Sequence, residues 1–345
     1  MTVSAVPPAT PGAFLAALRG TRAASPPVWF AGPAGPPVEA GAPGERGSVL
    51  EVDPARIAGR TVAPVVRHGA DAALLAAHVA VPLRLAGVAL DIDADGGLRV
   101  AEPVRTGSDV LQLRPFDPER LGPIREAVVL ALAALGGTPL VGVAAAPFTL
   151  ATLLIEGGPS RDRLRSRTMM YDDPHSWAAL LNWCADVAGE SLRAQIAAGA
   201  AAVQLVDPAL GALSRGDYFK RVLPHTQRVF SHLRGLDVPI IHTGIGTGEV
   251  LDLLARAGAS AVGVDRRIPL DTATERVGGE VPLLGGLDPA LLSARGHLLE
   301  AHLHDALARG TVARAHIVDL GGALPPGLNP AVLTRVVELV RGGAR

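Results

Sequence analysis

Eight short apolar runs, separated by stretches with a helical pattern, limit this chain to very few folds. The runs are VWF (28–30), AALLAAHV (72–79), PLVGVAA (139–145), AAVQLVD (201–207), PIIHTGI (239–245), SAVGVD (260–265), PLLGGLD (282–288) and AHIVDLG (315–321). Uninterrupted apolar strands that alternate with helices are typical of a parallel sheet buried on both faces. Eight such strands in one chain predict a single (β/α)8 TIM-like barrel of the α/β class.

The intervening helices and the chain length favour one domain. The stretches WAALLNWCADVAGESLRAQIAAG (177–199) and GEVLDLLARAG (248–258) have helical spacing, and each ends at a glycine. The 345 residues would fit one large barrel or two ordinary domains, and we find no second domain. We expect the barrel to span 13–345 and the Pro/Ala-rich residues 1–12 to form a disordered tail.

Charge and cysteine content exclude several classes of protein. The 32 basic and 33 acidic residues give a net charge of −1, which argues against a nucleic-acid surface. Cys184 is the only cysteine, so neither an intrachain disulfide nor a thiolate-rich metal site is expected. It lies in a helical pattern and is expected to be a small core residue. No signal peptide or membrane-spanning run is found, which predicts a cytosolic protein.

The carboxyl ends of the strands are where a barrel of this kind carries its chemistry. The first of these ends is chemically empty, because FAGPAGPP (30–37) has no ionisable side chain. The later ends include histidines and aspartates that could perform acid/base chemistry, namely His78, Asp207, His242, Asp265 and Asp288. Each Asp could instead cap the helix or turn that follows it. For Asp288 we expect the cap, whereas both roles stay open for Asp207 and Asp265.

Several blocks of the sequence resemble the uroporphyrinogen decarboxylase family. They are APFTLATLLIEGG (146–158), DPALGALSRGDYFKRVLP (207–224), VGVDRRIPL (262–270), LLGGLDPALL (283–292) and AHIVDLGGALPPGLNPAVLTRVVELV (315–340). They occur in the family's order, and the resemblance extends from about residue 13 to the end. It implies a barrel that removes four acetate carboxylates from an octacarboxylate tetrapyrrole, giving coproporphyrinogen for haem synthesis. It also implies a cytosolic homodimer with facing clefts and no cofactor or metal.

The sequence departs from that family at the positions that carry its chemistry. The family's motifs are F-M-R-Q-A-G-R-Y after strand one, S-D-I after strand two, T-Y-M-I-E-G-G, F-D-S-W and N-L-G-H-G. Its two loop arginines fall on Gly32 and Pro36, and its aspartate falls on His78. Its tyrosine, serine and histidine fall on Leu153, Pro208 and Gly322. No catalytic residue of the family is therefore retained.

These departures lead us to expect a divergent tetrapyrrole-pathway paralogue with lost or altered decarboxylase activity. Two alternatives stay open: a functioning decarboxylase that uses substitute residues, and a non-catalytic partner of an authentic decarboxylase. The candidate pocket residues are His78, Asp207, His242, Asp265 and Arg266, and Arg84, Arg161 and Arg267 are further possible cations.

A zinc methyltransferase of the same superfamily is a further alternative. Such enzymes bind Zn²⁺ through an H-x-C on strand five and a further Cys. In this chain His242 occupies the histidine position but Gly244 occupies the cysteine position. This alternative is disfavoured because the soft ligands of the metal are missing.

Overall fold

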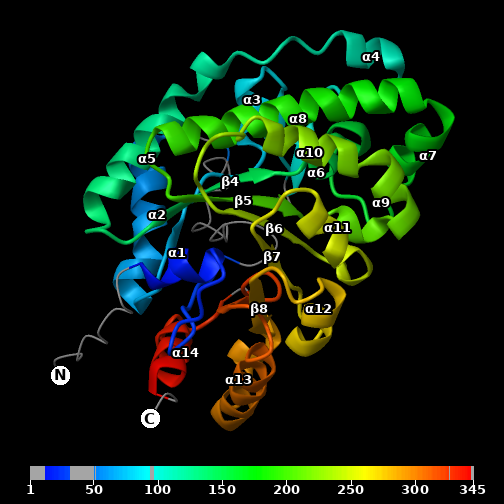
Figure 1. The fold of residues 1–345 in the computed structure, drawn as a ribbon. Coiled ribbons are helices and arrows are strands. Elements are labelled where there is room, and N and C mark those ends of the chain that lie inside the picture. Colours follow the sequence, from blue (N-terminus) through cyan, green and yellow to red (C-terminus); the bar gives the residue numbers. More distant parts are fainter. Residues whose placement is uncertain (1–11, 32–49, 51, 94–96, 326, 343–345) are drawn as a thin grey trace.

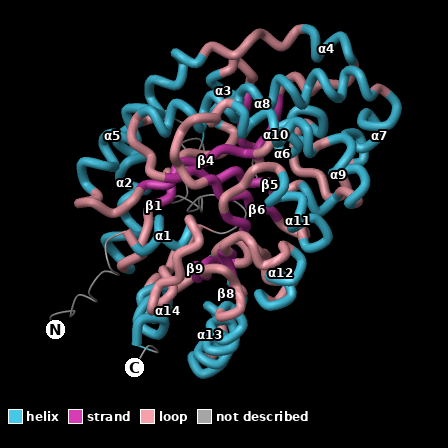
Figure 2. The backbone as a smooth tube through the Cα atoms, in the orientation of Figure 1, coloured by secondary structure: helices cyan, strands magenta, loops and turns pink. Residues whose placement is uncertain are grey.

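Seven parallel strands form one curled sheet at the centre of the computed structural model, and helices surround it (Figures 1 and 2). The structure describes residues 12–31, 50, 52–93, 97–325 and 327–342. In spatial order the strands are β1 (Ala73–Leu74), β4 (Leu140–Ala145), β5 (Ala202–Asp207), β6 (Ile240–Gly244), β7 (Ala261–Gly263), β8 (Leu283–Leu287) and β9 (His316–Leu320). Each strand lies within one of the predicted apolar runs.

The one remaining predicted run, VWF (28–30), closes the sheet into a barrel. Val28 forms a parallel bridge with Val318 of β9, and the Trp29 amide donates to the Val318 carbonyl at 2.8 Å. On its other side, the Val28 carbonyl accepts from the Asp71 amide at 2.9 Å, while the Val28 amide donates to the Asp71 carboxylate at 2.7 Å. The segment around Val28 thus joins the two edges of the sheet, and the TIM-like barrel is confirmed with its first strand reduced to a bridge.

Helices connect the strands on the outside, as parallel crossovers require, and a further helix, α1, precedes the first strand. They are α1 (Ala13–Leu18), α2 (Pro54–His68), α3 (Val81–Leu85), α4 (Gly107–Leu111), α5 (Gly122–Ala134), α6 (Pro147–Glu156), α7 (Leu164–Asp172), α8 (Pro174–Ala197), α9 (Arg215–Arg221), α10 (Leu223–Ser231), α11 (Leu251–Arg256), α12 (Leu270–Arg276), α13 (Gly296–Gly310) and α14 (Ala331–Gly342). An antiparallel hairpin of β2 (Leu90–Ile92) and β3 (Leu98–Val100) is an addition that the apolar runs did not predict.

The termini of α2 illustrate how local sequence fixes an element. The Asp53 carboxylate accepts hydrogen bonds from the amides of Ala55 and Arg56 at 2.9 and 3.2 Å, and Pro54 occupies the first turn. Aspartate before proline is a strong start signal, because the carboxylate satisfies free amides and proline lacks one. Gly69 ends the helix with a left-handed φ of 72°.

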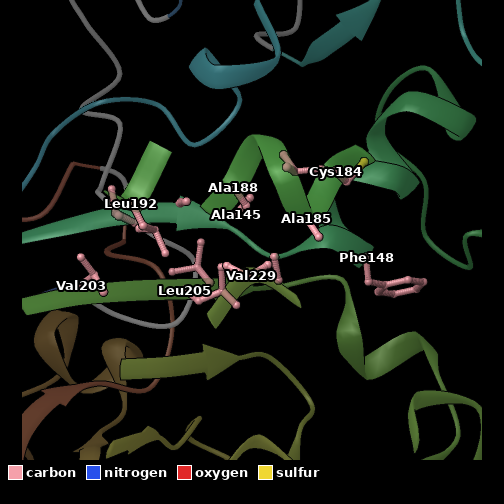
Figure 3. Packing of buried hydrophobic residues seen from close by; sticks show 14 of the residues in the cluster. Ala145, Phe148, Cys184, Ala185, Ala188, Leu192, Val203, Leu205 and Val229 are labelled. Atoms are coloured by element: carbon pink, nitrogen blue, oxygen red, sulfur yellow. The ribbon is translucent and has the colours of Figure 1, made fainter. Parts of the chain in front are cut away.

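Two buried layers divide the core. The inner layer fills the barrel at the amino ends of the strands and includes Trp29, Val141, Ile241, Ile317 and, from α1, Phe14. The outer layer packs the strands against the helices, and Figure 3 labels members from β4, β5, α8 and α10, among them Val203, Leu205, Cys184 and Val229. Cys184 is fully buried there and burial raises the pKa of its thiol, which confirms it as a core residue.

Among the described residues, no helix is both long enough and apolar enough to span a bilayer.

Candidate active site

Three positions that carry family chemistry converge on one cavity at the carboxyl ends of the strands. His78 follows β1, Leu153 lies on α6 and Pro208 follows β5, and all three line a cavity of about 240 Å³. Thr149 and Arg163 contribute polar atoms to the same wall. Gly32 and Pro36, the positions of the family's loop arginines, lie outside the described residues. The mouth of the barrel is therefore the candidate site.

His78 also lines a second, larger cavity and so lies between the two. This cavity has a volume of about 390 Å³, and its charged lining comes from α2. The charged and titratable lining residues are Arg56, Arg60, Arg67, His68 and His78. Arg56 and Arg60 are one helical turn apart, which brings both side chains to the same face. The sequence analysis did not identify these arginines as site residues. The signal was the four-residue spacing of Arg56 and Arg60 in the helix that follows the Gly/Pro loop of the first strand.

The hydrogen bond of His78 fixes which ring nitrogen carries its proton. Nδ1 accepts from the Ala80 amide at 3.2 Å, so the neutral ring carries its proton on Nε2. Burial lowers the pKa of His78 to about 4, and the imidazole is neutral at pH 7. His78 thus presents a hydrogen-bond donor through Nε2. It cannot offer the anionic acceptor that an aspartate would have supplied.

Asp207 is buried behind the wall of the mouth and acts on it through Thr149. Its Oδ1 accepts from the Thr149 hydroxyl at 2.5 Å, and the same hydroxyl oxygen accepts from the Ala209 amide at 3.3 Å. Oδ2 has no partner among the described residues. Burial raises the pKa of Asp207 to about 7, against the opposing effects of Thr149 and Arg163. Asp207 is therefore a substantially protonated acid that holds the turn after β5.

The next two aspartates cap backbone turns. The Asp265 carboxylate accepts from the Gly246 amide and, at 2.9 Å, from the Arg267 amide. It thereby ties the loop after β6 to the loop after β7. Asp288 accepts from the Ala290 amide at 3.0 Å, which confirms the expected cap. Of the two roles left open for Asp265, the geometry supports the cap.

The placement of His242 in the mouth is corrected by the structure. His242 lies in the middle of β6, where it is fully buried, and its ring meets Phe230 of α10 edge-on with centroids 5.9 Å apart. Its neighbour Ile241 faces the barrel interior, and alternate side chains of a strand point to opposite faces. His242 therefore faces the helices. Burial lowers the pKa of His242 to about 4, against the opposing effect of the Leu254 backbone.

Arg266 occupies the space beside the position of the family's histidine. Its amide donates to the Gly321 carbonyl at 3.1 Å, and a Cβ built on Gly322 would lie 3.5 Å from its Nη1. An arginine thus lies where the resemblance implies an imidazole. Arg84 is exposed on α3 and lines none of the cavities described in this section. Arg161 and Arg267 line a third cavity beside the mouth.

Among the described residues, no group of three or more His, Cys, Asp or Glu could hold a metal ion. His242 and Gly244 form no such group either, since His242 faces α10. The donor set of a zinc methyltransferase is thus not assembled within the described ranges.

Known proteins with similar sequences are decarboxylases by name. The family described as "Uroporphyrinogen decarboxylase (URO-D)" matches residues 10–343. The uroporphyrinogen decarboxylase of Arthrobacter sp. is 50% identical over 81% of this chain and 81% of its own length. That of Leifsonia xyli is 45% identical over 94% of this chain and 92% of its own, and that of Rhodococcus opacus is 46% identical over 95% and 94%.

Solved structures that are similar to this chain share its fold at low sequence identity. A methyltransferase from Methanosarcina mazei covers 97% of this chain and 99% of its own, with a TM-score of 0.82 at 17% identity. A B12-independent methionine synthase from Shewanella sp. covers 93% and 97%, with a TM-score of 0.60 at 12% identity. The family match over residues 10–343 and these decarboxylase relatives show that the chain belongs to the uroporphyrinogen decarboxylase family.

Proposed function

We propose that this protein decarboxylates a uroporphyrinogen-type tetrapyrrole, using substitute residues in its barrel mouth. The observation that carries the proposal is the 44–50% identity with relatives named for that activity, over four fifths or more of the chain. This identity favours the substitute-residue alternative over the loss of activity that the departures at Gly32, Pro36, His78, Leu153, Pro208 and Gly322 had suggested.

The charges of the mouth support binding of a polycarboxylate. A carboxylate leaves water for a partly apolar cavity only where cations meet it, because an unpaired buried charge is costly. Arg67 lines the cavity on one side of His78, and Arg163 lines the cavity on the other. Guanidinium groups bind carboxylates through two parallel hydrogen bonds, which fixes orientation as well as charge. These arginines would take over substrate binding from the strand-one loop.

His78 is the group that we assign to proton delivery. In the reaction the bond between the acetate methylene and its carboxylate breaks, CO2 leaves, and a proton bonds to the carbon, so that the acetate becomes a methyl group. The Nε2–H of His78 can donate to a substrate carboxylate. A bound carboxylate would also stabilise the imidazolium and raise the pKa of His78 from its value near 4. On substrate binding Nδ1 would exchange its hydrogen bond from the Ala80 amide for a proton, and the ring would then carry a transferable proton on Nε2.

A second candidate function is tetrapyrrole binding without turnover, as a paralogue or as a partner of an active decarboxylase. One specific observation favours it. Leu153 and Pro208 line the mouth without any side-chain hydrogen-bonding group, and Nδ1 of His78 is already occupied by the Ala80 amide. Glu156 is the acid among the described lining residues of this cavity, and its Oε1 already accepts from the Ser166 amide and hydroxyl at 2.9 and 2.7 Å.

Anaerobic turnover of uroporphyrinogen separates the two candidates. The purified full-length protein should form coproporphyrinogen, measured after oxidation as the four-carboxylate porphyrin. His78→Phe should lower kcat by about 100-fold or more, since a positioned proton donor typically contributes at least that much. His304→Gln, on the exposed surface of α13, is the matched control and should keep full activity. Absence of product from the wild type would favour the binding function, and an active His78→Phe would remove His78 from the mechanism.

We further propose a cytosolic homodimer in which residues 13–345 form one barrel domain. The family resemblance supports facing clefts, and the DPALGALSRGDYFKRVLP block (207–224) lies beside the mouth. Sedimentation at micromolar concentration should give about twice the 35.3 kDa chain mass. A single monomeric species at all concentrations would contradict this assembly. The tail expected at residues 1–12 lies outside the described residues except for Gly12.

A further inference from the structure

A third cavity next to the mouth is lined by a concentration of positive charge. It measures about 350 Å³ and is bounded by the α6–α7 connection, by α7 and by the loops that follow β5, β6 and β7. Its charged lining consists of Arg161, Arg163, Arg167 and Arg267, with Asp162 as the acid among the described lining residues. We call these four arginines the arginine shelf. Arg163, Pro208 and Ala209 line both this cavity and the one that contains His78, so the two spaces adjoin.

Close contact between loops holds one arginine of the shelf in place. A Cβ on Gly211 would lie 2.5 Å from the Ile245 carbonyl, so the loops after β5 and β6 touch there. A Cβ on Gly246 would lie 2.8 Å from Nη1 of Arg267, so this guanidinium lies over the Gly246 backbone. Asp265 holds both ends of the contact through the Gly246 and Arg267 amides. Arg267 is thus preorganised by backbone contacts.

Arg163 is held at the shelf by a strained backbone. It is the one non-glycine residue in the described ranges with a positive φ, at 48°. Its amide donates to the Ser160 hydroxyl at 3.1 Å, and its Nη1 donates to the Arg161 carbonyl at 3.0 Å. Residues other than glycine rarely adopt this backbone conformation. Where the surrounding structure enforces it, the position is a candidate for function. The Arg163 side chain lines both cavities.

The positive charge of the shelf is largely uncompensated. Arg161 and Asp162 approach to 3.9 Å, but both side chains are exposed, and such a pair contributes little. Neither Arg167 nor Arg267 has an ion-pair partner within 4 Å among the described residues, although Asp217 interacts electrostatically with Arg167. Four guanidiniums beside one exposed carboxylate leave the cavity with a net positive charge. Such a cavity favours an anion with several carboxylates.

We propose that the arginine shelf binds peripheral carboxylates of the tetrapyrrole while another edge of the same molecule lies at His78. This inference rests on the proposed function and adds a second anchoring point to it. The adjoining walls allow one macrocycle to reach both spaces, and the guanidinium forks match carboxylate geometry. The shelf would fix which acetate faces His78 and would favour substrates with more carboxylates over those with fewer.

The test combines binding with turnover in the full-length protein. The double variant Arg167→Gln/Arg267→Gln removes two shelf charges and leaves the strained Arg163 untouched. Arg165→Gln is the matched control, because Arg165 is exposed on the same helix and lines none of the three cavities. Three quantities are measured: the Kd for uroporphyrin, the oxidised octacarboxylate analogue, at low and high salt, and the KM and kcat for uroporphyrinogen. Thermal unfolding of all three proteins verifies folding.

The double variant should raise Kd and KM by roughly tenfold or more, from the loss of two charge-assisted hydrogen-bonding groups. Its Kd should depend less on salt than that of the wild type, since fewer ion pairs remain to be screened. Arg165→Gln should behave as wild type.

An active wild type whose KM and Kd are unchanged in the double variant overturns the shelf and leaves the proposed function intact. Arginine-dependent uroporphyrin binding without turnover supports the shelf and overturns the proposed function. Absence of uroporphyrin binding by the wild type overturns both.

Discussion

Asp207 is a carboxylic acid that the fold keeps substantially protonated near neutral pH. It is fully buried at the end of β5, with Oδ1 bonded to Thr149 and Oδ2 without a partner among the described residues. Its pKa is about 7 in the folded protein, against an ordinary value of 3.8. Folding therefore disfavours its ionised form. Because the folded-state pKa of Asp207 is raised, the protonated side chain contributes unfolding free energy that is fully present below about pH 4. This contribution is lost as the pH rises through about 7.

Asp207→Asn should remove this pH dependence. Between pH 5 and pH 8 the wild type should lose about 3 kcal/mol more unfolding free energy than the variant, because ionising the buried acid opposes folding. Asparagine can keep the acceptor for Thr149 and does not titrate. Urea denaturation of both proteins at the two pH values measures how much unfolding free energy each one loses. The contribution of the buried histidines is common to both proteins and cancels when the two losses are subtracted. Parallel pH dependence in the two proteins would contradict a raised pKa at this position.

At the scale of elements, the loops after β5, β6 and β7 depend on glycines for their close contact. Gly246 has a φ of 72°, and its missing side chain leaves room for Arg267. Gly278 has the same φ of 72°, but a Cβ there would meet nothing within 4 Å. The two positions therefore separate backbone strain from loss of the loop contact.

Gly278→Ala should lower the unfolding free energy by about 1 kcal/mol, which is the cost of a left-handed alanine. Gly246→Ala should cost more, because its methyl group also displaces Arg267, and it should weaken uroporphyrin binding. Chemical denaturation and porphyrin titration of the two variants give the comparison. Equal stability and equal binding in both would show that Arg267 does not rely on this contact.

At the scale of the whole molecule, a buried ion pair holds the barrel closed where its first strand is shortest. Arg341 of α14 donates to Asp71 at 2.7 Å and to the Gly69 carbonyl at 2.8 Å, and the other Asp71 oxygen binds the Val28 amide. The side chains of Arg341 and Asp71 are only 14% and 6% exposed. The chain thus joins its first strand, the turn after α2 and its last helix through one carboxylate.

Arg341→Met should lower the unfolding free energy by about 3–5 kcal/mol, because it leaves Asp71 buried without its partner. Arg335→Met on the same helix is the control, since its pair with Glu300 at 2.9 Å is half-exposed and should be worth about 1 kcal/mol or less. Denaturant unfolding monitored by tryptophan fluorescence measures both. A loss at Arg341 no greater than at Arg335 would refute this account of barrel closure.

The sequence by itself determined the order and type of the barrel strands. Each apolar run became a strand or, at Val28, a bridge, because a strand buried on both faces carries its signal in consecutive residues. The cap at Asp288 and the core position of Cys184 could be predicted for the same reason, as both depend on a few neighbouring residues. The resemblance to the family likewise implied that its side chains are absent at Leu153 and Pro208.

The tertiary structure decided which of these residues meet. His242 faces α10 because side chains alternate along β6, and Ile241 and Thr243 point into the barrel. Both faces of this strand are buried, so the sequence pattern does not indicate which residues point inward. The α2 arginines and the arginine shelf come from segments far apart in the chain, and only closure of the barrel brings the loops after different strands to one mouth. Local patterns encode which elements form, whereas the side chains that surround one space depend on packing between elements.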